Sequence, residues 1–369
     1  MFPVGALLIS VGAITAISTV LAILMVIADA TIANYGEVTI KINNDKELTV
    51  TGGKPLLSTL MEEGIFIPSA CGGRGACGLC KVKVLKGGGQ YLPTELPWIS
   101  EEEKADGIRL SCQIKVKTDL EIQIPEELFS VKEFRARVTK IADLTHDIKG
   151  ITLGLVEPRE IHYKAGQFIQ LKIPSYELTG EPVYRAYSMS SSPSNTRAIE
   201  LMIRYVPNGI STTYVHRYLK VGDEVFFNGP YGEFYLRDTD REIVFIAGGS
   251  GMAPIESILR DMAERRVNRR ARFFFGARTK RDLFHIDEMR ELETKLPNFQ
   301  FIPSLSAPLP EDNWKGESGL ITDIVDRYLE SGDNVEAYLC GSPGMIEACV
   351  KVLTENGVPE ELIYYDKFG

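Results

Sequence analysis

Residues 68–80 read PSACGGRGACGLC, and this stretch decides how the rest of the chain is interpreted. It holds three cysteines, and a fourth, Cys112, follows much later in the chain. The spacing C-x5-C-x2-C with one distant cysteine is typical of the four thiolates that hold a [2Fe–2S] cluster. The glycines support this interpretation, because a loop that points backbone N–H groups at sulfur atoms needs residues with positive φ.

A zinc site and a disulfide framework are the other interpretations of these cysteines. Zinc ribbons usually contain two C-x2-C pairs, whereas this chain contains one. Disulfide-rich secreted domains are short, whereas this chain has six cysteines in 369 residues. The first gap, of five residues, is longer than in plant-type ferredoxins and resembles that of adrenodoxin-like ferredoxins. We therefore predict a cluster whose metal ligands are Cys71, Cys77, Cys80 and Cys112.

The composition is that of an acidic globular protein. Hydrophobic residues make up 44% of the chain and charged residues 25%, and the formal net charge is −9. Nucleic acid is therefore a poor partner, because contacts to phosphates need a basic surface. The length predicts two or three domains. Free thiolates indicate a reducing compartment, so we expect the globular part to lie in the cytoplasm.

The N-terminal segment 2–28 carries no charged residue. It is longer than the roughly 20 residues that a helix needs to cross a bilayer. A cleaved signal peptide is the alternative, and residues 28–30, Ala-Asp-Ala, do have the character of a cleavage site. Against it, no Lys or Arg precedes the segment, and the apolar run is long. We predict a single-pass transmembrane anchor over 1–30 in the cytoplasmic (inner) membrane, with the soluble domains facing the cytoplasm.

Residues 31–130 are expected to form a small α+β ferredoxin domain of the β-grasp kind. Apolar and polar residues alternate over 38–42, and residues 48–50 follow after a polar turn, which predicts a hairpin. A helical pattern then begins after Pro55 and ends at Gly64. The cysteine loop and further short strands complete this domain.

Residues 131–237 contain short alternating strands with turn signals between them, which predicts an antiparallel Greek-key β-barrel. One strand carries Arg185, Tyr187 and Ser188. An Arg can bind phosphate with two hydrogen bonds, and a Tyr ring can stack on a flat cofactor. A second motif, starting at Gly209, predicts a loop into a helix whose N-terminal N–H groups could hold phosphate. Taken alone, the first motif would more often be an ordinary strand; the order of motifs in the chain favours a cofactor site.

Strands and helices alternate over 238–369, which predicts a parallel sheet with helices on both faces. The first strand is followed by GGSGMAP (248–254), where glycines allow close approach of a pyrophosphate and the next helix favours its charge. Cys340 is expected at the carboxyl end of a strand, facing the ligand crevice, and a small core residue is its alternative. Cys349 is expected in the core, and the terminal aromatic Phe368 could cover a flavin ring.

This order of motifs resembles the ferredoxin–NADP reductase superfamily, with a ferredoxin domain fused at the N-terminus. With the anchor included, the whole chain resembles the F subunits of the sodium-translocating NADH:quinone oxidoreductases. The stretches that carry the resemblance are SACGGRGACGLCKVKV (69–84), LPTEL (92–96), RAYSM (185–189), GPYGEF (229–234), VFIAGGSGMAP (244–254), FGAR (275–278), PEDNW (310–314) and YYDKFG (364–369).

The resemblance implies an NADH dehydrogenase that uses FAD and a [2Fe–2S] cluster. A hydride passes from NADH to FAD, and single electrons then pass to the cluster, to other membrane subunits of a respiratory complex and finally to quinone. Any sodium pumping would belong to the complex, since one uncharged helix offers no ion path. Cys340 and Phe368 are placed at the nicotinamide and over the flavin. The residues implied to bind FAD or the dinucleotide are Arg185, Tyr187, Ser188, Gly209, Ser211, Thr212, Gly249, Gly251 and Met252.

The same motifs are compatible with two other functions. Reductase components of mono- and dioxygenases share the ferredoxin, flavin and nucleotide parts but are normally soluble, so the segment 2–28 discriminates between the two. A non-catalytic membrane tether with a structural zinc site is the third possibility, and a colourless protein containing zinc would support it. The choice between NADH and NADPH is open too, because Arg278 suits a 2′-phosphate whereas Asp282 suits a free ribose hydroxyl.

Overall fold

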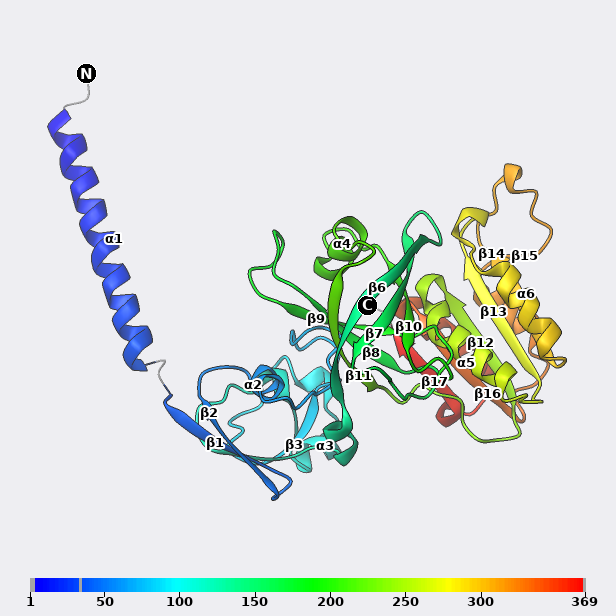
Figure 1. The fold of residues 1–369 in the computed structure, drawn as a ribbon, viewed down its shortest axis with the longest axis horizontal. Helices are drawn as coiled ribbons and strands as arrows, with labels where there is room; N and C mark the ends of the chain where they lie inside the picture. The colour runs from blue at the N-terminus through cyan, green and yellow to red at the C-terminus, as the bar shows by residue number, and fades with distance from the viewer. Residues whose placement is uncertain (1–3, 33–34, 368–369) are drawn as a thin grey trace. The chain divides into compact units, whose positions relative to one another are not determined.

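The computed structural model describes residues 4–32 and 35–367, with side chains described for 11–26 and 35–367. The chain divides into two compact units, Met1–Ser130 and Val131–Gly369. Figure 1 shows the elements of both units in chain order.

The N-terminal unit opens with helix α1 (Val4–Ile32). Its side chains at 11–26 are exposed and mostly apolar. Within the described part of the chain, no helix combines the length and the apolar character that crossing a membrane requires. The predicted anchor over 1–30 falls partly outside that search, because the side chains of 1–10 and 27–30 are not described.

The rest of this unit is a five-stranded sheet in the order β2-β1-β5-β3-β4. Strands β1 and β2 pair antiparallel, which confirms the predicted hairpin, and β1 pairs parallel with β5. Alternate residues of β1, such as Ile40 and Ile42, pack with Leu56 and Leu60 of α2 in one core. The cysteine loop joins α2 to β3. The bounds are β1 (Glu37–Ile42), β2 (Lys46–Thr51), α2 (Leu56–Glu62), β3 (Lys81–Lys86), α3 (Glu101–Ala105), β4 (Ile108–Leu110) and β5 (Leu120–Gln123).

The second unit begins with six antiparallel strands in the order β10-β7-β6-β11-β8-β9. A bridge between Met189, just after β9, and Leu201 of β10 brings the two edges together, so the sheet closes as the predicted barrel. Inward-facing residues such as Phe134, Ala136 and Val138 fill its interior. The bounds are β6 (Lys132–Asp143), β7 (Ile148–Glu157), β8 (Phe168–Ile173), β9 (Val183–Ser188), β10 (Ala198–Arg204), α4 (Ile210–Arg217) and β11 (Glu224–Tyr231).

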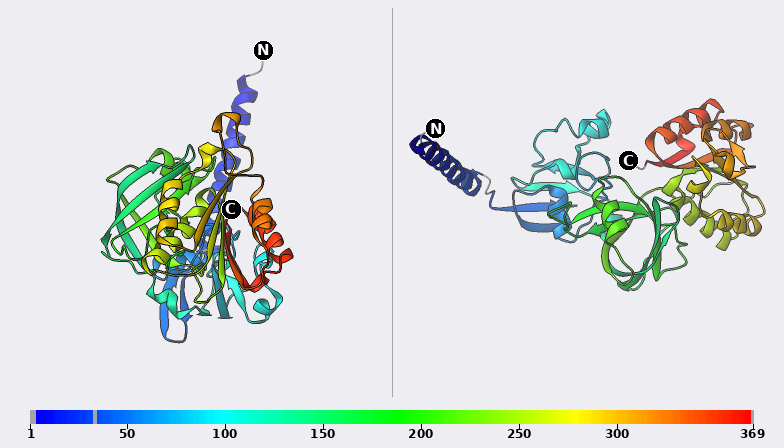
Figure 2. Two further views of the ribbon diagram at one scale, coloured as in Figure 1. Left: turned by 90° about the vertical axis from the view of Figure 1, so that its right-hand side faces the viewer. Right: turned by 90° about the horizontal axis from the view of Figure 1, so that it is seen from above.

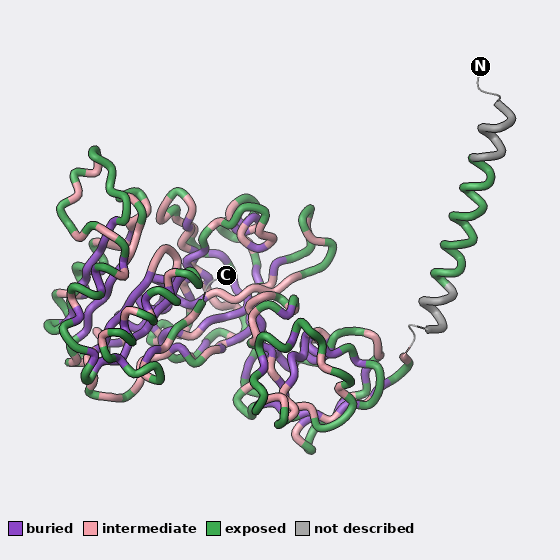
Figure 3. Tube along the Cα trace, turned by 180° about the vertical axis from the view of Figure 1, so that it is seen from behind, coloured by how far each residue is buried: buried purple, intermediate pink, exposed green. Residues whose placement is uncertain are grey.

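A parallel six-stranded sheet follows in the order β15-β14-β13-β12-β16-β17. Helices α5 and α6 share a core with one face, and α7 and α8 with the other (Figure 2). The central strands lie buried between exposed helix surfaces (Figure 3). The strand order reverses between β12 and β16, which is where open α/β sheets bind ligands. The bounds are β12 (Glu242–Gly248), α5 (Met252–Glu264), β13 (Ala271–Ala277), α6 (Ile286–Lys295), β14 (Phe299–Leu305), β15 (Glu317–Ser318), α7 (Ile321–Tyr328), β16 (Val335–Gly341), α8 (Pro343–Glu355) and β17 (Ile363–Lys367).

Candidate functional site

The cysteine loop turns on glycines. Four of them have φ between 66° and 84°, namely Gly72, Gly73, Gly75 and Gly78. Residues with a Cβ rarely adopt this conformation. A Cβ at Gly75 would also lie 2.8 Å from the side-chain nitrogen of Gln113, and a Cβ at Gly78 would lie 2.9 Å from the ring of Trp98. The loop therefore requires glycine both for its backbone conformation and for its close packing.

The four predicted metal ligands come together as two pairs of thiols. Cys71 hydrogen-bonds with Cys77, and Cys80 with Cys112. The bond from the partner thiol lowers the pKa of Cys71 to about 4 and that of Cys112 to about 7, against the opposing effect of burial. The same bonds raise the pKa of Cys77 and of Cys80. No group of three or more described His, Cys, Asp or Glu side chains surrounds a single metal position.

Backbone N–H groups reach these sulfur atoms, as the glycine content predicts. The N–H groups of Arg74 and Ala76 donate to Cys71, and that of Gly75 donates to Cys112. Such donors stabilise negative charge on ligating sulfur. Two thiol pairs with N–H donors fit a [2Fe–2S] cluster, in which each iron takes two thiolates.

The two sequence motifs of the barrel meet through one hydrogen bond. Tyr187 of β9 donates its hydroxyl hydrogen to the Oγ of Ser211 in α4, at 2.7 Å. Burial raises the pKa of Tyr187 to about 12, so its phenol stays protonated at neutral pH. Arg185 donates to the carbonyl oxygen of Tyr184 at 2.7 Å, and Ser188 is buried. The residues predicted to contact the flavin therefore lie on β9 and on the first turn of α4.

The side chain of Thr212 fixes the loop before α4 through hydrogen bonds to its backbone. Its hydroxyl lies 3.1 Å from both the backbone nitrogen and the carbonyl oxygen of Val206. A Cβ at Gly209 would lie 2.6 Å from this hydroxyl. Gly209 is the N-cap, and no side chain caps this helix end. The first-turn N–H groups are thus available to a phosphate, as the motif predicts.

The GGSG turn joins β12 to α5 beneath the ligand crevice. Gly249 has a φ of 56° and lines a cavity there. A Cβ at Gly251 would lie 2.2 Å from the carbonyl oxygen of Cys340, so only glycine fits against β16. The side chain of Met252, which is implied to line the dinucleotide site, lies in the core between the sheet and α5.

Cys340 is fully buried, and its side chain belongs to the same core. Its register partner on β17 is Asp366. Burial raises the pKa of Cys340, and the charge of Asp366 adds to this shift. Burial also raises the pKa of Asp366 to about 6. Phe368 lies outside the described residues.

The substitution Asp366→Asn should remove the part of the pH dependence of folding stability that comes from the Asp366 carboxyl group. An ordinary Asp loses its proton near pH 3.8, whereas Asp366 holds it until about pH 6 in the fold. The stability that this proton contributes is complete below about pH 4 and is lost as the pH rises through about 6. We expect the variant to melt at a higher temperature than the wild type at about pH 7.5, with a gain that shrinks towards about pH 5. Thermal melts across this pH range measure the difference in melting temperature, and Asp333→Asn, at an exposed position, is the control. An equal gain in melting temperature at every pH would contradict a raised pKa of Asp366.

A cavity of about 760 Å³ opens at the carboxyl ends of β12, β13 and β14. The nucleotide domain contributes Gly249, Arg278 and Asp282, among others, to its wall. The barrel contributes Asp147 and Arg204, whose side chains pair at 2.7 Å. Burial opposes the charged form of Asp147, but the hydrogen bonds from Arg204 and Thr145, together with the positive charge of Arg204, outweigh it, so the pKa of Asp147 is lowered. The cavity has the size of a cofactor site and the position predicted for the dinucleotide.

Asp282 and Arg278 both face this cavity. The carboxylate of Asp282 accepts hydrogen bonds from the backbone N–H and the hydroxyl of Thr279, each at 2.8 Å. Its other oxygen lies 3.6 Å from Nδ1 of His146. The two residues that bear on nucleotide choice therefore belong to one site.

The residues that the barrel adds to this cavity form no recognisable motif in the sequence. Asp147 and Arg204 are separated by 57 positions in the chain, and His146 stands in a turn before β7. No local spacing links them. Only the pairing of β7 with β10 brings them together.

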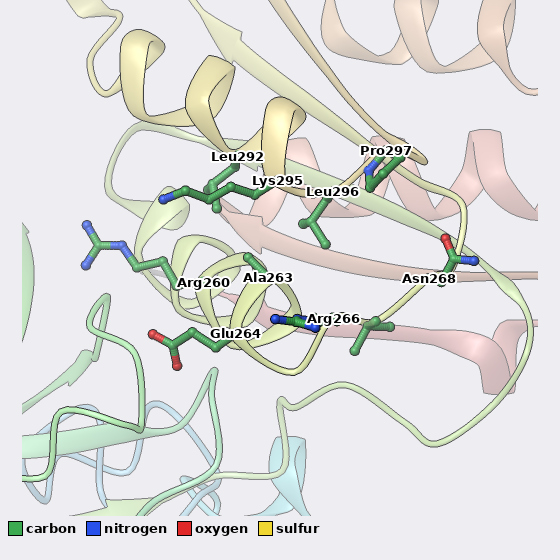
Figure 4. A pocket seen from close by; sticks show the side chains of 10 residues that line it. Arg260, Ala263, Glu264, Arg266, Asn268, Leu292, Lys295, Leu296 and Pro297 are labelled. Atoms are coloured by element: carbon green, nitrogen blue, oxygen red, sulfur yellow. The ribbon is translucent and has the colours of Figure 1, made fainter.

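A second cavity, of about 570 Å³, lies between the C-terminal ends of α5 and α6 (Figure 4). Its floor is apolar and its rim carries both basic and acidic side chains. It contains none of the predicted site residues. Its lining is Arg260, Ala263, Glu264, Arg266, Val267, Asn268, Leu292, Lys295, Leu296 and Pro297.

Family models match three consecutive parts of the chain. Residues 40–117 match a 2Fe-2S iron-sulfur cluster binding domain, 135–235 an oxidoreductase FAD-binding domain and 245–351 an oxidoreductase NAD-binding domain. Among solved structures, an Amycolatopsis cytochrome P450 reductase is 29% identical, with a TM-score of 0.73 over 90% of this chain and 98% of the other. A ferredoxin reductase in carbazole 1,9a-dioxygenase is 28% identical, with a TM-score of 0.69 over 90% and 99%.

The fold and the three sites define an NAD-binding flavin reductase with a fused [2Fe–2S] ferredoxin domain. The F subunit of the Na(+)-translocating NADH-quinone reductase of Neisseria meningitidis is 40% identical over 96% of this chain and 97% of its own length. Its counterpart in Actinobacillus succinogenes is 39% identical over 97% and 98%. The chain belongs to this family of F subunits.

Proposed function

We propose that this chain is the electron-input component of a membrane-bound sodium-translocating NADH:quinone oxidoreductase. It oxidises NADH and delivers electrons to partner subunits, through which they reach quinone. The observation that carries this proposal is the identity of 39–40% to F subunits over nearly the whole chain, across all three cofactor domains.

We assign FAD to the face formed by β9 and α4. When bound there, FAD would take up the hydride as two electrons and a proton and would pass the electrons on one at a time, as the cluster requires. Arg185 binds a phosphate of FAD, and the first turn of α4 from Gly209 receives the pyrophosphate. Tyr187, fixed by its bond to Ser211, packs against the flavin. The neutral phenol supports this role, because it gives its one hydrogen to Ser211 and brings no charge to the flavin.

We assign NADH to the cavity of about 760 Å³. Gly249 and Gly251 bring the backbone close to the pyrophosphate, and the N-terminus of α5 favours its negative charge. Cys340 is fully buried near the end of β16, and we assign it a supporting role behind the nicotinamide site. Phe368 follows β17 and is assigned to the flavin face on sequence grounds alone.

Asp282 should select NADH over NADPH. Its carboxylate lines the cavity just after the second strand of the nucleotide fold, where an acidic group repels a 2′-phosphate. We expect Asp282→Asn to raise the ratio of kcat/KM for NADPH to that for NADH about fivefold, since one like-charge contact in an open, water-filled cavity costs on the order of 1 kcal/mol. Asn keeps an oxygen for Thr279, so the loop stays capped. Arg278→Leu should move the ratio the other way, and an unchanged ratio in both variants would contradict the assignment.

We also propose that α1 anchors the chain in the cytoplasmic membrane, with the cofactor domains facing the cytoplasm. The uncharged segment 2–28 and the exposed apolar side chains over 11–26 support this proposal. Lipid would cover these apolar side chains, whose exposure to water is unfavourable.

A soluble reductase component of an oxygenase is the second candidate function. The similarity to the Amycolatopsis reductase and to the carbazole dioxygenase reductase, at 28–29% identity, favours it. Membrane fractionation separates the two candidates. A chain that stays with membranes after a high-salt wash, and copurifies with quinone-reducing subunits, supports the respiratory complex. A soluble pool of the protein that reduces an oxygenase would overturn the assignment to the respiratory complex.

A further inference from the structure

A buried ion pair fastens the segment LPTEL (92–96) to the strand that leads to the fourth cysteine. Glu95 is 0% exposed and Arg109 is 3% exposed. The carboxylate of Glu95 accepts two hydrogen bonds from the guanidinium of Arg109, at 2.8 and 2.7 Å. Other guanidinium N–H groups donate to the carbonyl oxygens of residues 88–90. Such dense bonding is the condition under which a buried ion pair is tolerated.

The same carboxylate fixes the backbone around Cys112. Glu95 accepts the N–H of Leu110 at 3.1 Å and that of Leu92 at 2.8 Å. Cys112 lies two residues beyond Leu110, and the N–H of the intervening Ser111 donates to the carbonyl oxygen of Cys80 at 2.8 Å. One side chain thus ties the loop 92–96 to the backbone that carries the second thiol pair.

Thr94, the residue next to Glu95, is linked to the sulfur of Cys112 through the side chain of Gln113. Thr94 donates its hydroxyl hydrogen to Oε1 of Gln113 at 2.8 Å, and Nε2 of Gln113 donates to the Sγ of Cys112 at 3.3 Å. A thiolate only accepts hydrogen bonds, so the amide nitrogen must face the sulfur and the amide oxygen must face Thr94. Gly75 leaves room for the amide, because a Cβ there would lie 2.8 Å from its nitrogen.

We propose that Gln113, oriented by Thr94, raises the reduction potential of the cluster through its hydrogen bond to Cys112. The Glu95–Arg109 pair holds this relay in place. Donors to ligating sulfur stabilise the negative charge that the reduced cluster gains. The relay therefore favours acceptance of an electron by the cluster. The inference rests on the proposed assignment of the cluster to the four cysteines.

Redox titration of the full-length protein, with FAD and cluster in place, tests the proposal. Gln113→Leu removes the donor at similar volume, and we expect the equilibrium constant for cluster reduction to fall about tenfold, which is about 59 mV for one electron. The EPR spectrum of the reduced cluster should change with it. Iron content and the rate of flavin reduction by NADH should match the wild type. Thr94→Val leaves the donor without its orienting partner, so it should shift the potential the same way by less.

Gln123→Leu, on an exposed position of β5, is the matched control and should leave the potential unchanged. A wild-type potential in Gln113→Leu would overturn the proposal. If that variant fails to retain iron, Thr94→Val decides: a lowered potential supports the relay, and an unchanged one refutes it. A wild-type protein without iron would instead refute the cluster assignment on which the inference rests.

Discussion

Cys77→Ser should still reduce its flavin with NADH at the wild-type rate but pass almost nothing onward. Cys77 forms one thiol pair with Cys71, and a Ser oxygen is a poor replacement for the soft thiolate that iron–sulfur clusters need. We expect the cluster to be lost and electron transfer beyond the flavin to fall by at least about 100-fold. Stopped-flow bleaching of the flavin measures the first step, and quinone reduction by the assembled complex measures the rest.

Cys349→Ala is the matched control for this variant. Cys349 lies in the core between α8 and the sheet, so its loss should leave both steps in place. If Cys77→Ser also abolished the reduction of flavin by NADH, the order of electron transfer proposed for this chain would be wrong.

Gly251→Ala should abolish most use of NADH while leaving the cluster intact. A Cβ at this position would lie 2.2 Å from the carbonyl oxygen of Cys340, and backbone atoms of β16 offer no easy relief. Overpacking of this kind costs roughly 1–3 kcal/mol and displaces the turn that is assigned to the pyrophosphate. We expect kcat/KM for NADH to fall at least about tenfold, with FAD and iron contents unchanged.

Gly344→Ala tests whether this loss is specific. A Cβ at Gly344 meets nothing within 4 Å, so the substitution should leave kcat/KM for NADH near the wild-type value. Equal losses in both variants, or a fully active Gly251→Ala, would contradict the assigned role of the turn.

Local patterns in the sequence predict those parts of the fold and the site that depend on neighbours in the chain. The glycines of the cysteine loop indicate positive φ, and the loop has it at Gly72, Gly73, Gly75 and Gly78. Alternating apolar residues predict the hairpin of β1 and β2, and the alternation of strands and helices predicts the parallel sheet. In each case one residue type at one spacing has a direct conformational consequence.

Contacts between distant segments could not be predicted in the same way. Glu95 stands in an ordinary-looking loop, and only the fold shows that Arg109 neutralises it in the interior. The bond from Gln113 to Cys112 joins chain neighbours, yet it depends on Thr94, which lies 19 positions earlier. The cavity wall formed by Asp147 and Arg204 likewise depends on the pairing of β7 with β10. Side-chain partners of this kind follow from strand register rather than from local spacing.

Position at a strand end is a weaker guide to the direction of a side chain, as Cys340 illustrates. Its place near the end of β16 predicts a thiol that faces the crevice, but the thiol is fully buried and its backbone packs against Gly251. Side chains alternate across a sheet, so a residue at the correct end of a strand can still point into the core.

An anaerobic titration of the detergent-solubilised wild-type protein with NADH tests the central claim most directly. Absorbance follows the flavin, EPR follows the cluster, and iron and flavin analysis fixes their amounts. The account predicts two irons and one FAD per chain, with the flavin bleached before the one-electron signal of a reduced [2Fe–2S] cluster appears. A protein that binds flavin but no iron, or a cluster that NADH does not reduce, would contradict it.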